Sequence, residues 1–230
     1  MATRPIFIPK ANTIGVTEKM LEFQWHSGFA VSQKQKSVEE LHMVARKNGL
    51  NSVLEASSKS LLELGIELSA FNLTIKTKKN NNKFTVETAF QGSKVFEHGG
   101  PFKDLFGDDS LAAKKDLRLK QSGNLVSFEF FGMEFPLVPR TYFYDWLYIN
   151  ALLQHSDLTD QIMDFDGYSD IEFNPKKSIN CQAHAIALFV SLVKNGVEAQ
   201  EIKNPQAFLS LCSKHYTQQN RHIVVQPKMF

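Results

Sequence analysis

The stretch KFTVETAFQGSKVF, residues 83–96, decides the local fold because two secondary-structure periods meet within it. Its first residues alternate apolar and polar side chains, which indicates a strand. The remainder has helical spacing and places Glu87, Gln91 and Lys94 on one face of a helix. On that helix Glu87 and Lys94 are about 10 Å apart along the axis. This separation is too long for a simple ion pair and fits opposite ends of a sugar-sized ligand. Spacing alone also fits a solvated polar stripe on an amphipathic helix, which is the more common case.

The sequence on either side predicts an α+β fold. Residues 73–77 alternate and a polar turn follows, so with residues 84–86 they predict a hairpin that leads into the helix. A second hairpin is predicted over 125–135. A helix over 142–154 is apolar around most of its circumference and is expected to be buried, and a further helix is predicted over 179–194. We therefore expect a helix-rich α+β domain with small β-hairpins rather than a parallel wound sheet.

Other local signals set expected boundaries. A capping box at residues 37–40 predicts the start of a helix that ends at Asn48-Gly49. Residues 51–56 are a predicted strand, and the Gly-Gly-Pro break at 99–101 is expected to end the helix that contains Glu87. Residues 223–225 are apolar and β-branched, which suggests an edge strand.

Bulk composition favours a globular protein of one domain over residues 1–230. The chain has 230 residues, 43% of them hydrophobic, and 19 are phenylalanine. The net charge of +2 predicts no broad electrostatic footprint for nucleic acid. Two cysteines are too few for a disulfide framework, and no apolar run is long enough for a signal peptide or a membrane span. These features predict a cytoplasmic protein with no membrane partner.

No cofactor and no metal is predicted. The sequence has no GxGxxG or GxxxxGK phosphate-binding motif, no CxxC pair and no HExxH helix. Cys181 and His184 have the spacing of two ligands on one helix, but two ligands do not make a zinc site. Cys181 is expected to be a buried apolar residue. The other histidines, His215 included, are expected at the surface or at helix caps.

Several motifs together resemble one protein family. LSAFNL (68–73) followed by VETAFQGSK (86–94) resembles the paired signature of the NADAR (YbiA-like) family, whose typical form is LSNFYP and then a VEHxYQAxK-like helix. AKKDLR (113–118), the helix that starts at Tyr142 and SINCQAHAIALFVSL (178–192) follow in the family's order. The resemblance covers about residues 68–192, with residues 1–67 as an N-terminal extension. Further segments are similar to the NADAR antitoxins that accompany DarT-type DNA ADP-ribosyltransferase toxins; they are FQWHSGFAVSQKQKS, VLEASSKS, FYDWLYINAL and DIEFNPKKSINCQA.

The resemblance implies a hydrolase of N-glycosidic bonds that removes ADP-ribose from guanine in DNA and so acts as an antitoxin. It implies three partners: ADP-ribosylated DNA, the ADP-ribose product and a cognate DarT-type toxin. Cleavage of such a bond places positive charge on the anomeric carbon and negative charge on the departing nitrogen. Within the matched motif, Lys94 is expected to be the covalent nucleophile or an electrostatic catalyst, and Glu87 the general acid/base. The sequence does not fix which residue has which role.

Supporting residues are expected from four other segments. Phe71 is a candidate to stack on the base or a ribose, and Ser69 and Asn72 to bind sugar hydroxyls. Gln91 shares the catalytic helix face. The remaining candidates are Asp170 and Asn180, near the start of the 179–194 helix, and Trp146 on the aromatic helix. Core packing and helix capping account for Phe71, Trp146, Asp170 and Asn180 as well.

Departures from the family pattern leave the base specificity open. Ala70, Asn72, Thr88 and Gly92 replace the family's Asn, Tyr, His and Ala. Two alternative functions therefore stay open: an N-glycosidase for small phosphorylated ribosylamines of the riboflavin-pathway type, and a non-catalytic protein that binds ADP-ribose or the toxin.

Overall fold

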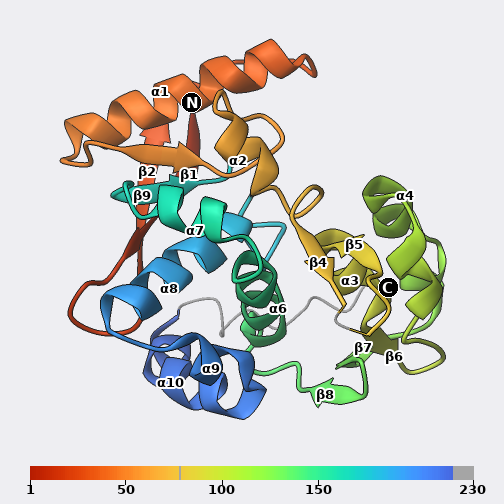
Figure 1. Ribbon diagram of the computed structural model, residues 1–230. Helices are drawn as coiled ribbons and strands as arrows, with labels where there is room; N and C mark the ends of the chain where they lie inside the picture. Colours follow the sequence, from red (N-terminus) through yellow and green to blue (C-terminus); the bar gives the residue numbers. More distant parts are fainter. Residues whose placement is uncertain (78, 220–230) are drawn as a thin grey trace.

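The computed structural model describes residues 1–77 and 79–219, and Figure 1 shows how their elements are arranged. A four-stranded sheet has the order β2 (Val16–Phe23), β1 (Ala2–Pro9), β9 (Gly167–Ser169) and β3 (Val53–Glu55). β1 is antiparallel to both of its neighbours, whereas β3 and β9 are parallel. The sheet therefore brings the N-terminal strands next to segments that lie far away in the sequence.

Apolar side chains on the two faces of this sheet contribute to two separate cores. Ile6 and Phe7 are consecutive residues of β1 and belong to different clusters, as the alternation of side chains along a strand requires. One face packs against α1 (Val31–Lys47) through Leu41. The other face packs against α8 (Gln182–Lys194), which in turn contacts α6 (Tyr142–Leu152).

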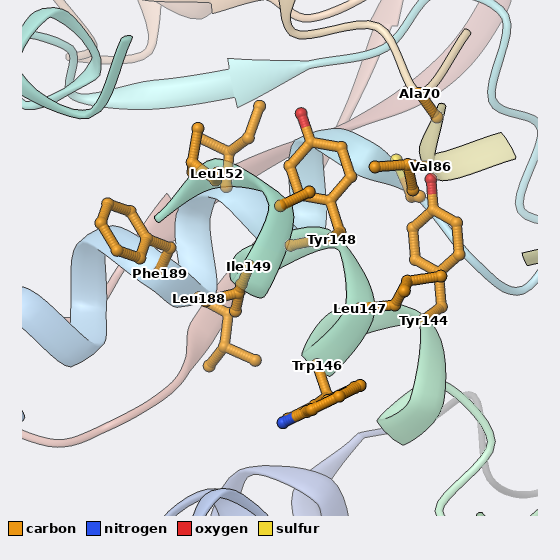
Figure 2. Packing of buried hydrophobic residues seen from close by; sticks show 14 of the residues in the cluster. Ala70, Val86, Tyr144, Trp146, Leu147, Tyr148, Ile149, Leu152, Leu188 and Phe189 are labelled. Atoms are coloured by element: carbon orange, nitrogen blue, oxygen red, sulfur yellow. The ribbon is translucent and has the colours of Figure 1, made fainter. Parts of the chain in front are cut away.

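The aromatic helix α6 is buried along almost its whole length, which confirms the prediction from its composition. Ten of its 11 residues are buried. It lies between the sheet half of the molecule and the hairpin half (Figure 1). Figure 2 shows Tyr144 directed toward Ala70 and Val86, while Trp146 extends in a different direction. The Tyr148 hydroxyl donates a hydrogen bond to the Leu68 carbonyl, which ties the loop that carries Ser69 and Phe71 to the core.

Both predicted hairpins are present. β4 (Thr74–Lys76) pairs with β5 (Lys83–Thr85), and β5 leads directly into α3 (Val86–Gly92). β7 (Leu125–Phe130) and β8 (Met133–Phe135) form the second hairpin, to which β6 (Lys94–Phe96) adds a third strand. These small sheets together with the helices confirm the α+β class.

The helix around Glu87 is shorter than its sequence periodicity predicts. α3 ends at Gly92, and Lys94 lies in β6, where it pairs with Phe128. Strand pairing satisfies the Lys94 backbone groups that would otherwise continue the helix. The predicted stop at 99–101 was therefore wrong for this helix, and Gly99 instead bridges to Phe96 after β6.

Several other boundaries also differ from the predictions. α1 begins at Val31, so the start predicted from the capping box at residues 37–40 was wrong. Ser37 lies inside the helix, where its hydroxyl donates to the Gln33 carbonyl of the preceding turn and does not cap the helix. Its end at Asn48, followed by Gly49 at φ +90°, agrees with the prediction. α8 begins at Gln182, so Asn180 lies in the preceding loop. The predicted strand at 223–225 lies outside the described residues.

The remaining helices complete the described structure. They are α2 (Glu63–Glu67), η1 (Lys103–Gly107), α4 (Ser110–Lys115), α5 (Arg118–Gln121), α7 (Ser156–Ile162), α9 (Ala199–Lys203) and α10 (Pro205–Gln218). None of the described helices combines the length and the apolar character that a membrane crossing needs.

Close packing at Gly92 makes a first prediction. A Cβ at this position would lie 2.6 Å from the Phe106 ring and 2.9 Å from the Phe102 carbonyl oxygen. We expect Gly92→Ala to lower the free energy of unfolding by about 1–2 kcal/mol, because overpacking outweighs the better helix propensity of alanine. Urea denaturation measures the change. Gly107→Ala is the control, since a Cβ added at Gly107 would have nothing within 4 Å; stabilisation by Gly92→Ala would contradict the packing argument.

Candidate active site

A cleft of about 820 Å³ lies where the hairpin half of the molecule meets the sheet half. Its hairpin side is lined by residues 69–71, α3, Lys94, Lys114 and part of the β7–β8 region. Its sheet side is lined by the loops that follow β3 and β9, and Tyr144 of α6 also contributes. The cleft is large enough for a nucleotide-sized ligand.

Glu87, Gln91 and Lys94 form a continuous hydrogen-bonded chain on one wall. Lys94 Nζ donates to Gln91 Oε1 at 2.6 Å, and Gln91 Nε2 donates to Glu87 Oε1 at 2.8 Å. Glu87 and Gln91 are buried, whereas Lys94 is half-buried. The three residues expected on one helix face are therefore joined by hydrogen bonds, although Lys94 reaches Gln91 from a strand.

Burial strongly affects the Lys94 amine. Desolvation by burial lowers the pKa of Lys94, the Glu87 carboxylate opposes this shift and the Lys114 ammonium adds to it. Together these effects bring the pKa of Lys94 to about 8. The Lys94 ammonium also lies 4.9 Å from the centre of the Phe90 ring. A lysine with a pKa this close to neutrality supplies the uncharged, nucleophilic amine far more readily than an exposed lysine does.

Lys114 lies between the hydrogen-bonded chain and the aromatic ring of Phe71. Its Nζ lies 3.7 Å from Glu87 Oε1 and 4.9 Å from the centre of the Phe71 ring. Because the Lys114 side chain is about half exposed, we assign this ion pair little stability. Its position at the cleft places a positive charge and a half-buried aromatic ring beside the candidate catalytic residues.

The loop after β9 supplies a buried carboxyl group. Asp170 Oδ1 accepts hydrogen bonds from the backbone N–H groups of Glu172 and Phe173. Burial first, and then the charge of Glu55, raise the pKa of Asp170 to about 8. Both effects favour the protonated form of the Asp170 carboxyl group near neutrality.

Gln182, the first residue of α8, holds two loops near the cleft together. Its Oε1 accepts the Ala70 N–H, and its Nε2 donates to the Ala56 carbonyl, so one side chain joins the loop that follows β3 to the loop that precedes β4. Asn180 Oδ1, in the same lining, is buried without a hydrogen-bond partner among the described residues. An unpaired buried acceptor of this kind is costly unless a ligand donates to it.

The cleft brings together seven of the nine residues proposed from the sequence. They are Glu87, Lys94, Gln91, Ser69, Phe71, Asp170 and Asn180. Asn72 does not line it; its exposed side chain donates to the Ile66 carbonyl. Trp146 lies instead beside a second cavity of about 620 Å³, between α6 and β4.

Sequence reasoning missed several lining residues. Lys114, Arg140, Tyr144, Lys177 and Gln182 all reach the cleft. Lys114 lies within the AKKDLR segment, so the matched motif itself was a signal for it. Tyr144, Lys177 and Gln182 likewise lie within segments that resemble the antitoxins. Of the five, Arg140 alone had no such signal, because its distance from Lys94 in sequence gives no indication of proximity in space.

The Cys181–His184 pair does not form a metal site. Cys181 is buried, as expected, and lines the cleft. His184 Nδ1 lies instead 3.1 Å from Asp145 Oδ1, and its Nε2 lies 3.2 Å from His215 Nε2. His215 is therefore buried in this network, and its predicted surface or capping position was wrong. Within the described residues, no group of three or more His, Cys, Asp or Glu side chains is placed to hold a metal ion.

Comparison with protein families identifies the chain. A family model described as DarT1-associated NADAR antitoxin matches residues 2–222. The chain belongs to this antitoxin family. No curated protein matches it. The match to the NADAR-DarT1 family begins at the first residue of β1 and so includes the N-terminal strands.

The electrostatics of this NADAR antitoxin site can be tested at Lys94. We expect Glu87→Gln to lower the pKa of Lys94, because a favourable negative charge is lost, and Lys114→Gln to raise it, because a repulsive positive charge is lost. NMR titration of the Lys94 side-chain resonances, assigned with Lys94→Arg, measures both changes. A titration midpoint near the ordinary lysine value of about 10.4 in the wild type would contradict the role of burial.

Proposed function

We propose that this NADAR antitoxin hydrolyses the N-glycosidic bond between ADP-ribose and guanine in DNA, with Lys94 as the nucleophile and Glu87 as the general acid/base. The observation that carries the proposal is the Lys94–Gln91–Glu87 chain on the wall of a nucleotide-sized cleft. This activity reverses the modification made by a DNA ADP-ribosyltransferase, which is what an antitoxin of this kind requires.

The surroundings of Lys94 support covalent catalysis. Its lowered pKa makes the neutral amine available to attack the anomeric carbon of the ribose attached to guanine. Gln91 binds the amine and Glu87 at once, so it holds the two groups a fixed distance apart. After guanine has departed, Glu87 accepts a proton from the water that releases the sugar from Lys94.

The rest of the cleft supports ADP-ribose as the bound group. Phe71 offers an aromatic face, and Lys114, Arg140 and Lys177 place cationic side chains along the lining, which suits a diphosphate. Asn180 Oδ1 is a free acceptor for a ribose hydroxyl. Guanine within a duplex cannot enter such a cleft, so the base is reached in single-stranded DNA or after extrusion.

The first test of function is release of ADP-ribose from single-stranded DNA that carries ADP-ribosylated guanine. We expect release by the wild type and a fall of roughly 10²–10⁴-fold in both Lys94→Ala and Glu87→Gln. The glycosylamine that Lys94 forms with the sugar can open its ring to an imine, with its proton passing to the ring oxygen. Borohydride added during turnover should reduce this imine and so trap a covalent adduct in the wild type and not in Lys94→Ala. Lys115→Ala removes an exposed neighbouring lysine and should behave as the wild type.

The alternative functions give different results in this assay. Release of sugar from small phosphorylated ribosylamines, with none from modified DNA, would assign the chain to metabolite hydrolysis. Protection of cells that persists in Lys94→Ala and Glu87→Gln would assign it to binding of ADP-ribose or of the toxin without catalysis.

The unpaired acceptor of Asn180 makes a separate binding prediction. We expect Asn180→Ala, introduced into the inactive Lys94→Ala background, to weaken ADP-ribose binding about tenfold through loss of a hydrogen bond. Calorimetry measures the affinity. Asn72→Ala is the matched control, because Asn72 does not line the cleft; equal losses in the two variants would argue against a ligand contact at Asn180.

A further inference from the structure

The buried side chain of Glu55 binds the residues on either side of Asp170 in the sequence. Glu55 is the residue of β3 that pairs with Ser169 of β9. Its side chain accepts hydrogen bonds from the Ser169 hydroxyl and from the Ile171 N–H, the two neighbours of Asp170 in sequence. Glu55 is buried and is absent from the cleft lining. It therefore reaches the cleft through neighbouring residues, Ser57 on one side and the loop that carries Asp170 on the other.

Burial raises the pKa of Glu55, and the hydrogen bonds to its carboxylate oppose this shift because they favour the charged form. Three donors reach its carboxylate: the Ser57 hydroxyl at 2.6 Å, the Ser169 hydroxyl at 2.5 Å and the Ile171 N–H at 2.8 Å. The Ser169 oxygen in turn lies 2.8 Å from His42 Nε2, which fits donation from a neutral ring. Burial, aided by Arg46, lowers the pKa of His42 to about 4, so this ring is uncharged near neutrality.

Asp170 has the complementary arrangement, which suits a protonated carboxyl group. Both of its backbone donors bind Oδ1, and Oδ2 makes no hydrogen bond with any described residue. Asp170 is 8% exposed and lines the cleft, so its unbonded oxygen is available there to a ligand. A proton on Oδ2 is thus placed where a substrate atom can receive it.

The charged and titratable groups around Asp170 come from several elements. They are Arg4 of β1, Glu55 of β3, Glu172 of the same loop, Tyr144 and Tyr148 of α6, and Cys181 before α8. Arg4 opposes protonation of Asp170, whereas burial and the charges of Glu55 and Glu172 favour it. The pKa values of both tyrosines are raised by burial, so their phenols stay neutral.

We propose that Asp170 is the acid that protonates the departing guanine, and that Glu55 is a positioning residue that keeps the proton on Asp170. This inference rests on the proposed function. When the bond between the anomeric carbon and the guanine nitrogen breaks, its electron pair stays on the nitrogen. The nitrogen takes the proton from Asp170, and the Lys94 amine forms a new bond to the anomeric carbon. Water then replaces Lys94 on the sugar, and Glu87 accepts the water proton. Glu87 releases this proton to solvent and Asp170 regains one from solvent, so both groups return to their starting states.

The test compares the pH dependence of ADP-ribose release in wild type and Glu55→Gln, with Glu67→Gln as an exposed carboxylate control. Loss of the Glu55 charge should lower the pKa of Asp170. Because Lys94 and Glu87 are common to both proteins, the ratio of variant to wild-type kcat/KM cancels their titration. We expect this ratio to be near one at about pH 6 and to fall about tenfold at about pH 9, for a drop of one pKa unit. A ratio that stays constant with pH would overturn the role of Glu55.

Asp170→Asn tests the acid itself. This variant should lose at least 100-fold in kcat/KM at every pH and still bind ADP-ribose in calorimetry. Retention of activity within a few-fold would overturn the assignment of Asp170.

A direct titration separates failure of this inference from failure of the proposed function. The Asp170 carboxyl carbon in aspartate-labelled protein, assigned with Asp170→Asn, should titrate near pH 8 in the wild type and lower in Glu55→Gln. This measurement needs no substrate and no folded Glu55 variant for its first result. A wild-type titration midpoint of Asp170 near the ordinary aspartate value of about 3.9 overturns the inference, even if ADP-ribose is released. Absence of ADP-ribose release overturns the proposed function, whatever the titration shows.

Discussion

The burial of α6 is the constraint on which the candidate site depends. A helix with almost no solvent face must be covered on every side, and here α8 and α3 cover it from the two halves of the molecule. Tyr148 anchors the loop before Asn72 to this helix, and Tyr144 of the same helix lines the cleft. The two halves therefore meet at a fixed geometry, and the cleft is formed at their junction.

The same burial governs the chemistry of the cleft. Desolvation penalises the charged form of any group, so it lowers the pKa of Lys94 and raises the pKa of Asp170. The amine becomes a better nucleophile and the carboxyl a better proton donor at the same pH. Local partners then adjust each group: Glu87 opposes the shift at Lys94, whereas Glu55 reinforces the shift at Asp170. One physical effect thus favours the neutral forms of both a lysine and an aspartate in a single cleft.

Sequence periodicity predicted the hairpins and the buried aromatic helix because these patterns depend on neighbours within a few residues. It overextended α3, since helical spacing continues through Lys94 while the backbone there pairs with β7. A strand partner more than thirty residues away in sequence decides that boundary, and no local pattern reports it. Gly92 replaces the alanine typical of the motif at the point of closest approach to Phe106.

The sequence by itself determined the α+β class, the resemblance to NADAR antitoxins and the two catalytic candidates, because each is encoded in short contiguous motifs. Only the tertiary structure decided which other residues share the cleft. It excluded Asn72 and Trp146, and it added Lys114 beside Glu87 and Glu55 behind Asp170. The physical reason is that burial and proximity between distant segments arise from strand pairing and helix packing, and the pKa values of Lys94 and Asp170 depend on both.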